Sequence, residues 1–162
     1  MSTGFELFMA LESGFSPTPE EVARKMMEVA HLKRGEVFYD LGSGDGTLLI
    51  IAAKEFGACA IGIEIQEKLV KDSRKRIRSL NLGKMIRVVK GDYFKADIRD
   101  ANVLTLYLIP EALERLKLKL TKELRKGARI VVYKYPMEGW TPKEVHETNA
   151  ENAKAKVFLY QM

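Results

Sequence analysis

The chain has one cysteine and two histidines, and it contains no long run of hydrophobic residues. Cys59 therefore has no partner for an internal disulfide, and so few ligands predict no bound metal. Because Cys59 lies in an apolar segment, we expect it to be a small core residue. A membrane span needs about 18 consecutive apolar residues, and a signal peptide needs a basic start. Lacking both, the sequence predicts a soluble, cytoplasmic protein that does not bind membranes.

The total charge of the chain is nearly balanced. Its 162 residues include 27 Lys and Arg and 22 Asp and Glu, which gives a net charge of +5. The excess is small, so it indicates acidic partners only weakly. Charged residues make up 30% of the chain, whereas Asn and Gln are few, and this balance is typical of proteins from hot environments. The length suits a single domain, which we expect to be monomeric.

The chain is organised around residues 37–47, which read VFYDLGSGDGT. A short apolar strand leads into three glycines and then a helical pattern, an arrangement that presents backbone N–H groups to a nucleotide-like ligand. A dinucleotide fingerprint would place the third glycine one position later, where Thr47 stands. Asp40 and Asp45 flank the turn and would repel a pyrophosphate, but they would attract an ammonium and a sulfonium. The pattern D-L-G-S-G-D-G resembles the first motif of class I S-adenosylmethionine (SAM) methyltransferases.

Two further carboxylates follow later strands. Glu64 ends an apolar run. The number of residues from Gly46 to Glu64 is close to the number expected when the later residue is a carboxylate that binds a ribose diol. Asp92 either caps a short helical turn or, in the methyltransferase interpretation that we favour, accepts a hydrogen bond from the adenine amino group. Tyr93 would then lie beside the adenine ring.

The rest of the chain alternates strands and helices, which predicts an α/β fold with a mostly parallel sheet. Strands are predicted at 36–40, 58–63, 85–90, 101–109 and 128–133, and helices at 19–31, 46–56, 66–80 and from Pro110. Residues 144–148 and 154–160 predict a closing antiparallel hairpin, which completes seven strands. Only residues 134–143 separate the fifth strand from this hairpin. The fold is therefore a reduced one, with no full helix there and no inserted substrate domain.

Two of these helices carry features beyond their periodicity. Thr18 is predicted to cap the helix at 19–31, with Pro19 in its first position. The helix at 66–80 is predicted to bury Leu69, Val70, Ile77 and Leu80 and to expose Lys68, Lys71, Arg74, Lys75, Arg76 and Arg78. We interpret these charges as a solvated face, and a nucleic-acid-binding stripe is the alternative.

Residues 1–16 carry three phenylalanines, at positions 5, 8 and 15. A free terminus rarely keeps such residues unless they pack on something. They either cover the core or form a lid over the cofactor and the substrate. We therefore treat residues 1–16 as a lid or arm and residues 17–162 as one SAM-dependent methyltransferase domain.

Methyl transfer from SAM is an in-line displacement that needs positioning, exclusion of water and a free lone pair on the acceptor. We expect the acceptor at the end of the fourth strand, around residues 106–110. The N/D-P-P-Y/F motif of enzymes that methylate adenine or glutamine amino groups is absent there. An apolar, aromatic rim instead suits a long aliphatic amine, whose pKa it lowers by desolvation. The candidate rim residues are Tyr107, to which we assign the catalytic position, Leu108, Tyr133, Tyr135 and Trp140.

Several segments together resemble one small family, the archaeal protein-lysine methyltransferases, which are similar to the mitochondrial lysine methyltransferases. The segments are S-P-T-P-E-E-V, D-L-G-S-G-D-G, G-I-E, K-G-D-Y-F, the run from Tyr107 to Arg129, and Gly139-Trp140. The resemblance implies the Rossmann-like sandwich of class I methyltransferases, with SAM as the cofactor and S-adenosylhomocysteine as the product. It implies that Asp40, Gly42, Gly44 and Glu64 hold the methionine and ribose portions, Asp92 and Tyr93 the adenine, and Thr18 the carboxylate. Ser43, Asp45, Gly46 and Ile65 complete the expected cofactor site.

The leading functional hypothesis is methylation of lysine side chains in proteins, with broad specificity. A small-molecule or RNA methyltransferase is the second, and it is favoured by the basic surface. A non-catalytic SAM-binding module is the third. The acids Asp40, Glu64 and Asp92 predict cofactor binding under each hypothesis, so they do not separate the three hypotheses.

Overall fold

Seven strands form one sheet in the computed structural model, which describes residues 16–150 and 152–162. The lid or arm expected at 1–16 lies outside the described residues except for Ser16. The helices are α2 (Glu20–Val29), α3 (Thr47–Phe56), α4 (Glu67–Ser79) and α5 (Pro110–Glu123). The strands are β1 (Val37–Leu41), β2 (Cys59–Glu64), β3 (Ile86–Lys90), β4 (Val103–Leu106), β5 (Arg129–Tyr133), β6 (Glu144–Ala150) and β7 (Ala153–Gln161).

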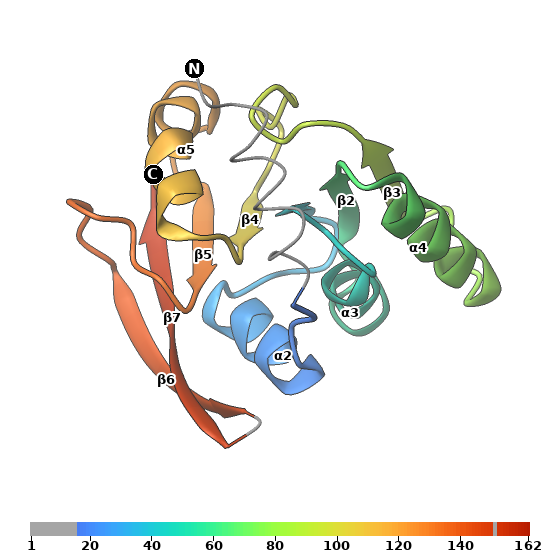
Figure 1. The fold of residues 1–162 in the computed structure, drawn as a ribbon, viewed down its shortest axis with the longest axis horizontal. Helices are drawn as coiled ribbons and strands as arrows, with labels where there is room; N and C mark the ends of the chain where they lie inside the picture. The colour runs from blue at the N-terminus through green and yellow to red at the C-terminus, as the bar shows by residue number, and fades with distance from the viewer. Residues whose placement is uncertain (1–15, 151) are drawn as a thin grey trace.

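The order of the strands is β3-β2-β1-β4-β5-β7-β6 (Figure 1). Strands β1 to β5 are parallel, whereas β7 pairs antiparallel with both β5 and β6. This arrangement confirms the predicted α/β fold and its closing hairpin. The strand order reverses direction between β1 and β4, and ligands of open α/β sheets bind beside such a point, at the carboxyl ends of the strands.

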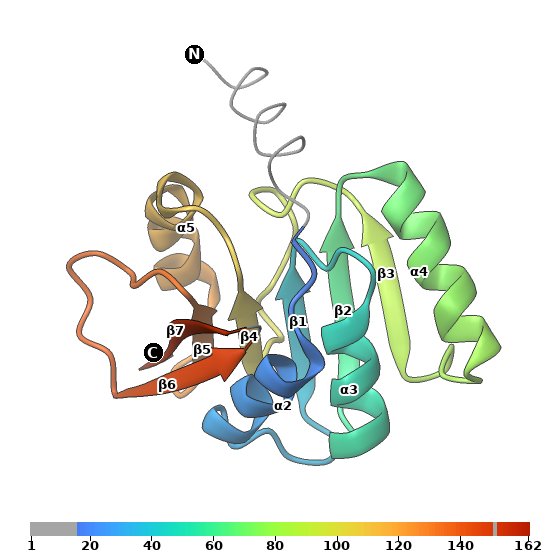
Figure 2. The same ribbon diagram turned by 60° about the horizontal axis from the view of Figure 1, so that its bottom comes forward.

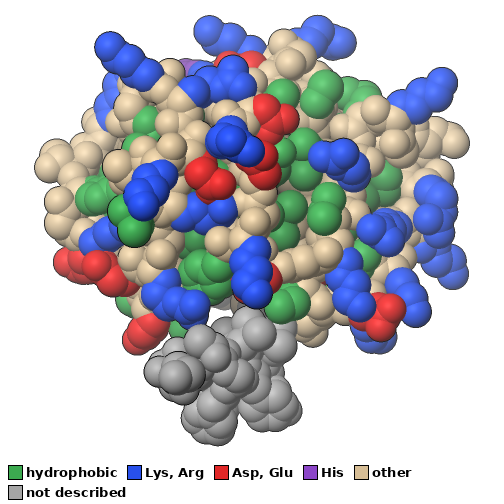
Figure 3. All heavy atoms as spheres, turned by 90° about the horizontal axis from the view of Figure 1, so that it is seen from above, with side chains coloured by type: hydrophobic (Ala, Val, Ile, Leu, Met, Phe, Trp, Pro, Cys, Tyr) green, Lys and Arg blue, Asp and Glu red, His purple; other side chains and the backbone are tan. Residues whose placement is uncertain are grey.

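Helices cover both faces of the sheet. Alternate residues of β1 point to opposite sides, so Phe38 joins a core with α2, α3 and α4, whereas Tyr39 joins a second core with α5. Figure 2 shows α2 and α3 in front of the sheet and α5 behind it. Leucines at positions 113, 116 and 120 of α5 and at its C-cap, 124, are all buried. Seen from above, Lys and Arg side chains are spread over the face and its rim, and hydrophobic side chains show between them (Figure 3).

Three predictions about single residues were wrong. Cys59 is exposed, and it is the first residue of β2, at the amino end of the strand. Leu80 is 42% exposed, because α4 ends one residue earlier and Leu80 is its C-cap, whereas Ile77 in the last turn remains buried. Helix α2 begins at Glu20 with Pro19 as its N-cap, so Thr18 precedes the cap and makes no side-chain capping bond.

The connection from β5 to β6 contains no helix, which confirms the reduced fold. It is held instead by a buried hydrogen bond of 2.8 Å from the Met137 N–H to the hydroxyl oxygen of Tyr160 on β7. Among residues 16–150 and 152–162, every helix falls short of the length and apolar character that a membrane span requires. The same residues contain no group of three potential metal ligands.

Candidate cofactor and acceptor site

The glycine turn joins the carboxyl end of β1 to α3. Gly42, Gly44 and Gly46 have φ values of 82°, 55° and 82°, in the left-handed region that side chains with a Cβ avoid. The N–H groups of Gly42 and Ser43 donate to the carbonyl oxygen of Ile63 on β2, at 2.8 and 3.1 Å. The turn therefore folds across the end of β2 rather than extending away from the sheet.

Glu64 fixes the centre of this turn. Its Oε2 accepts a hydrogen bond of 2.8 Å from the Gly44 N–H, and its Oε1 accepts bonds of 3.0 Å from the N–H groups of Ile65 and Gln66. The side chain is buried, with 5% of the residue exposed. Two carboxylate oxygens offer about four acceptor positions, so one remains available in addition to these three bonds. The predicted ribose contact is compatible with this geometry, and Glu64 also shapes the turn before any ligand arrives.

Asp40 lies at the end of β1, beneath the turn. Burial, together with smaller contributions from the negative charges of Glu64 and Asp45, raises the pKa of its carboxyl from 3.8 to about 7. The Thr105 hydroxyl donates a hydrogen bond of 2.9 Å to Oδ1, which favours the ionised form but does not outweigh the burial. This buried carboxyl has one neutral hydrogen-bond donor. A cationic group of a ligand beside it would stabilise its ionised form.

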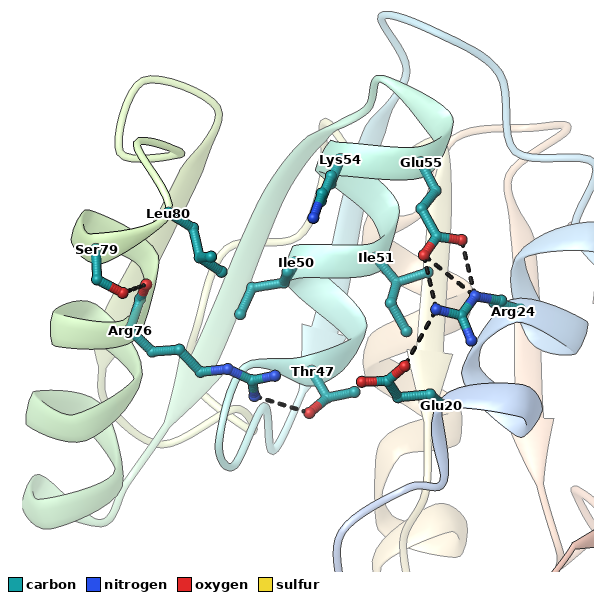
Figure 4. Close-up of a pocket in the computed structure, with 10 residues that line it drawn as sticks. All are labelled: Glu20, Arg24, Thr47, Ile50, Ile51, Lys54, Glu55, Arg76, Ser79 and Leu80. Atoms are coloured by element: carbon teal, nitrogen blue, oxygen red, sulfur yellow. Dashed lines mark hydrogen bonds and ion pairs between the residues drawn. The ribbon is translucent and has the colours of Figure 1, made fainter.

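Asp45 is less available for a ligand than the sequence suggested. Its Oδ1 accepts a bond of 3.0 Å from the Thr47 N–H, and its Oδ2 lies 3.8 Å from Nη1 of Arg76. The same guanidinium nitrogen donates to Oγ1 of Thr47 at 3.0 Å, as Figure 4 shows. Arg76 was predicted to face solvent, but it reaches across from α4 to hold the start of α3. Its charge offsets that of Asp45, which leaves Asp40 and Glu64 as the unpaired acids of the turn.

Asp92 and Tyr93 follow β3 at the same edge of the sheet. Oδ1 of Asp92 accepts a bond of 2.9 Å from the Phe94 N–H, so this carboxylate does cap a short turn, while Oδ2 takes no part in that bond. A Cβ built on Gly42 would lie 4.0 Å from a ring carbon of Tyr93 and 3.6 Å from Cδ2 of Leu108. The ends of β1, β3 and β4 therefore meet around Gly42. Burial raises the pKa of Tyr93 to about 12, and Asp92 contributes to this shift.

The remaining cofactor candidates surround these groups. Ser43 lies beneath the turn, because a Cβ on Gly62 would be only 2.5 Å from its hydroxyl oxygen. That hydroxyl is buried and makes no hydrogen bond among the described residues. Thr18 is half-buried and precedes α2, and Figure 2 shows the chain passing near the carboxyl end of β1 before it enters this helix.

The candidate acceptor residues fall into two groups. The rings of Tyr107 and Tyr133 lie 4.7 Å apart at the carboxyl ends of β4 and β5. Trp140 instead lies 6.0 Å from Tyr160, which pairs with Ile130 near the opposite end of β5. The structure therefore brings Tyr107 and Tyr133 together and places Trp140 away from them.

Lys134 is a residue of this region that the sequence reasoning missed. It follows β5 with a left-handed φ of 79°, and its Nζ lies 5.3 Å from the centre of the Tyr135 ring. The pKa of its ammonium is raised, first by the neighbouring Tyr107 and then by a hydrogen bond with Tyr135. The signal was present in the run Tyr133-Lys134-Tyr135, which places a lysine between two aromatic residues just after a strand.

A parallel sheet with a glycine turn after β1, an acid at the end of β2 and an acid after β3 is the arrangement of a SAM-dependent methyltransferase. Comparison with known proteins makes the assignment specific. The family described as the ANTKMT methyltransferase domain matches residues 40–144, and the chain belongs to this family.

Relatives and solved structures agree with this family. A protein-lysine N-methyltransferase of Saccharolobus islandicus is 39% identical and aligns over 90% of this chain and 91% of its own. The adenine nucleotide translocase lysine N-methyltransferase of Mus musculus is 31% identical over 85% of this chain, which spans only 64% of that protein. A crystal structure of an RNA methyltransferase from Salinibacter ruber with S-adenosylhomocysteine has a TM-score of 0.86. It is 36% identical and covers 90% of this chain and 93% of that one. SAM is therefore the cofactor of this enzyme.

Proposed function

We propose that this enzyme transfers methyl groups from SAM to lysine side chains of proteins. The observation that carries the proposal is the position of Lys134, whose Nζ lies 5.3 Å from the centre of the Tyr135 ring after β5, with a pKa that Tyr107 and Tyr135 raise. These aromatic residues already accommodate an alkyl ammonium, the group that a substrate lysine would bring. The name of the Saccharolobus relative supports the same acceptor.

In this proposal, the cofactor rests on the ends of β1, β2 and β3. Asp40 attracts the ammonium of the methionine portion, Glu64 accepts hydrogen bonds from the ribose, and Oδ2 of Asp92 accepts one from the adenine amino group. Gly42 allows close approach between Tyr93 and Leu108. Thr18 binds the carboxylate, while Ser43, Gly44, Asp45, Gly46 and Ile65 shape the turn around the ligand. The bound cofactor supplies a methyl group activated by its sulfonium.

On the acceptor side, the tyrosines hold the stem of the substrate lysine and exclude water. The incoming amine must be neutral to offer its lone pair, and a fixed positive charge nearby lowers an amine pKa. Lys134 supplies such a charge. Tyr107 therefore packs on the stem of the substrate lysine, and Lys134 favours loss of the proton. Tyr133 supports Tyr107, Tyr135 orients Lys134, and Trp140 takes part only if the substrate extends toward β7.

We also propose that residues 17–162 act as one monomeric domain in the cytoplasm, and that the phenylalanines of residues 1–16 close over the cofactor. The proposal that these phenylalanines close over the cofactor is supported by the path of the described chain, which approaches α2 from the carboxyl edge of the sheet (Figure 2). The composition favours an origin in a hot environment.

The similarity to the Salinibacter RNA methyltransferase favours RNA as a second candidate acceptor. Incubation with methyl-labelled SAM and separate pools of cellular protein and RNA distinguishes the two. We expect label in protein, recovered as methyl-lysine after acid hydrolysis. Label confined to RNA would establish the second candidate, and no transfer to either pool would leave a SAM-binding module. The variant Glu64→Ala serves as the control, since wild-type transfer by this variant would reveal a contaminating enzyme.

A further inference from the structure

The positive charge of the chain is concentrated in one helix and the strand that follows it. Residues 67–90, which comprise α4, the connecting turn and β3, contain nine Lys and Arg and two acids, a net charge of +7. The rest of the chain has 18 basic and 20 acidic residues, a net charge of −2. A protein of nearly balanced composition therefore presents one strongly basic unit, which we call the α4–β3 unit.

The charges of this unit face solvent. All of its Lys and Arg except Arg76 are exposed, at positions 68, 71, 74, 75, 78, 84, 87 and 90. Lys71, Lys75 and Arg78 have the i, i+4, i+7 spacing of one helical face, where neighbouring side chains lie about 5–6 Å apart. Figure 3 shows many Lys and Arg side chains on the right, the side on which α4 lies in Figure 1.

The two acids of the unit do not neutralise this face. Glu67 lies 3.7 Å from Nζ of Lys71 and 3.6 Å from Nζ of Lys90, so it ties α4 to the end of β3. Asp72 pairs with Lys68 at 2.6 Å. Lys75, Arg78 and Lys84 occur in none of the ion pairs between described residues. Their charges are available to a partner.

The chemistry of the face indicates what that partner is. Interfaces between proteins have a largely apolar centre with aromatic or aliphatic anchors. Within residues 67–90, Leu80 is the single large hydrophobic side chain that is exposed. A row of exposed cations without an apolar centre fits a regular polyanion instead, which such a row binds by displacing condensed counterions. We propose that the α4–β3 unit binds the phosphate backbone of duplex nucleic acid without reading its sequence.

This surface is separate from the methyl-transfer site. The acceptor residues lie at the ends of β4 and β5, and β1 and β2 stand between them and β3 in the sheet. Bound nucleic acid would leave the acceptor site open and concentrate the enzyme near proteins that associate with the same duplex.

The test is the binding of the whole protein to fluorescent duplexes of DNA and of RNA, measured by anisotropy over a range of salt. Each phosphate contact contributes about −0.9 to the slope of log K against log salt for DNA, and non-specific Kd values are about 1–100 µM. The triple variant Lys75→Gln/Arg78→Gln/Lys84→Gln should bind at least about tenfold more weakly, with a slope shallower by about 2–3. A difference in affinity between the DNA and RNA duplexes identifies the nucleic acid whose backbone is preferred.

The matched control removes the same charge from the opposite side of the sheet, as Lys122→Gln/Arg125→Gln/Lys126→Gln near the end of α5. We expect less than about a threefold loss for this control at equal salt. Equal losses in the two triple variants would overturn the proposal, because net charge alone would then explain binding. Failure of the wild type to bind either duplex at low salt would also overturn it, as would tighter binding to polyglutamate, which would assign the face to an acidic protein. SAM affinity reports folding, and the double variant Lys75→Gln/Arg78→Gln repeats the test should the triple variant be unstable.

Discussion

Asp40→Asn should stabilise the protein without its cofactor while weakening cofactor binding. The pKa of Asp40 is about 7 in the folded protein and 3.8 in the reference state. Between these values the folded state keeps a proton that the unfolded state releases, so this residue lowers stability as pH rises from about 4 to 7 and the loss then levels off. The full difference corresponds to about 4 kcal/mol, of which more than half develops between pH 5 and pH 8.

Asparagine is neutral throughout, and its amide oxygen can still accept the hydrogen bond from Thr105. The free energy of unfolding of the variant, relative to the wild type, should therefore rise by about 2–3 kcal/mol from pH 5 to pH 8. Urea denaturation at both pH values measures it. Asp72→Asn, on the exposed face of α4, is the control and should change the unfolding free energy by less than about 0.5 kcal/mol. An equal stability difference at the two pH values would refute the reasoning, since Asp40 would then be ionised across the whole range.

Four other predictions concern the same site. Glu64→Ala should weaken SAM binding at least tenfold, because charge-assisted hydrogen bonds contribute about 1.5–3 kcal/mol each; unchanged affinity by calorimetry in a folded variant would remove Glu64 from the site. Gly62→Ala should destabilise the fold by about 1–3 kcal/mol, since its Cβ would lie within 2.6 Å of Ser43 and Leu49. Gly83→Ala, with open space around it, is the control, and equal melting temperatures would contradict the clash. Tyr107→Ala should reduce transfer to protein but keep SAM affinity within about threefold. Tyr107→Phe should retain much of the activity if packing on the lysine stem matters most. Loss of cofactor affinity in the alanine variant would make Tyr107 a core residue. The rate of transfer should rise between about pH 7 and 9 as the substrate lysine, with an ordinary pKa near 10.4, loses its proton. A rate that does not change with pH, measured where the chemical step limits turnover, would exclude a lysine acceptor.

Local pattern was sufficient to predict most of the elements. Apolar runs located the central strands β1, β2, β4 and β5, because a strand buried on both faces leaves few polar residues in its sequence. Strand β6, which reads EVHETNA, is mostly polar and was predicted only as part of the closing hairpin. Strand β4 proved shorter than the apolar run at 101–109, since the chain leaves the sheet at Tyr107 to place Pro110 in the first turn of α5. The end of an apolar run does not reveal where hydrogen bonding to the neighbouring strand stops.

Contacts between distant segments were harder to predict. Arg76 has the helical spacing of a solvent-facing residue, yet its long side chain reaches Thr47, 29 positions away. Trp140 lies close in sequence to Tyr135, but the chain between β5 and β6 carries it toward β7. Both outcomes depend on how whole elements pack together, and the periodicity of one segment carries no information about that packing.

Arg74 has a consequence for how the molecule behaves at high concentration. Strand β3 is at the edge of the sheet, and Met85 and Gly91 pair with β2 through their backbone groups. Alternation then points the backbone groups of Val88 outward. The guanidinium of Arg74 donates to this carbonyl oxygen at 2.7 and 3.1 Å. An exposed strand edge is a template for fibrils and other edge-to-edge assembly, and a bulky cation already seated on the central acceptor of β3 blocks a second chain from adding there.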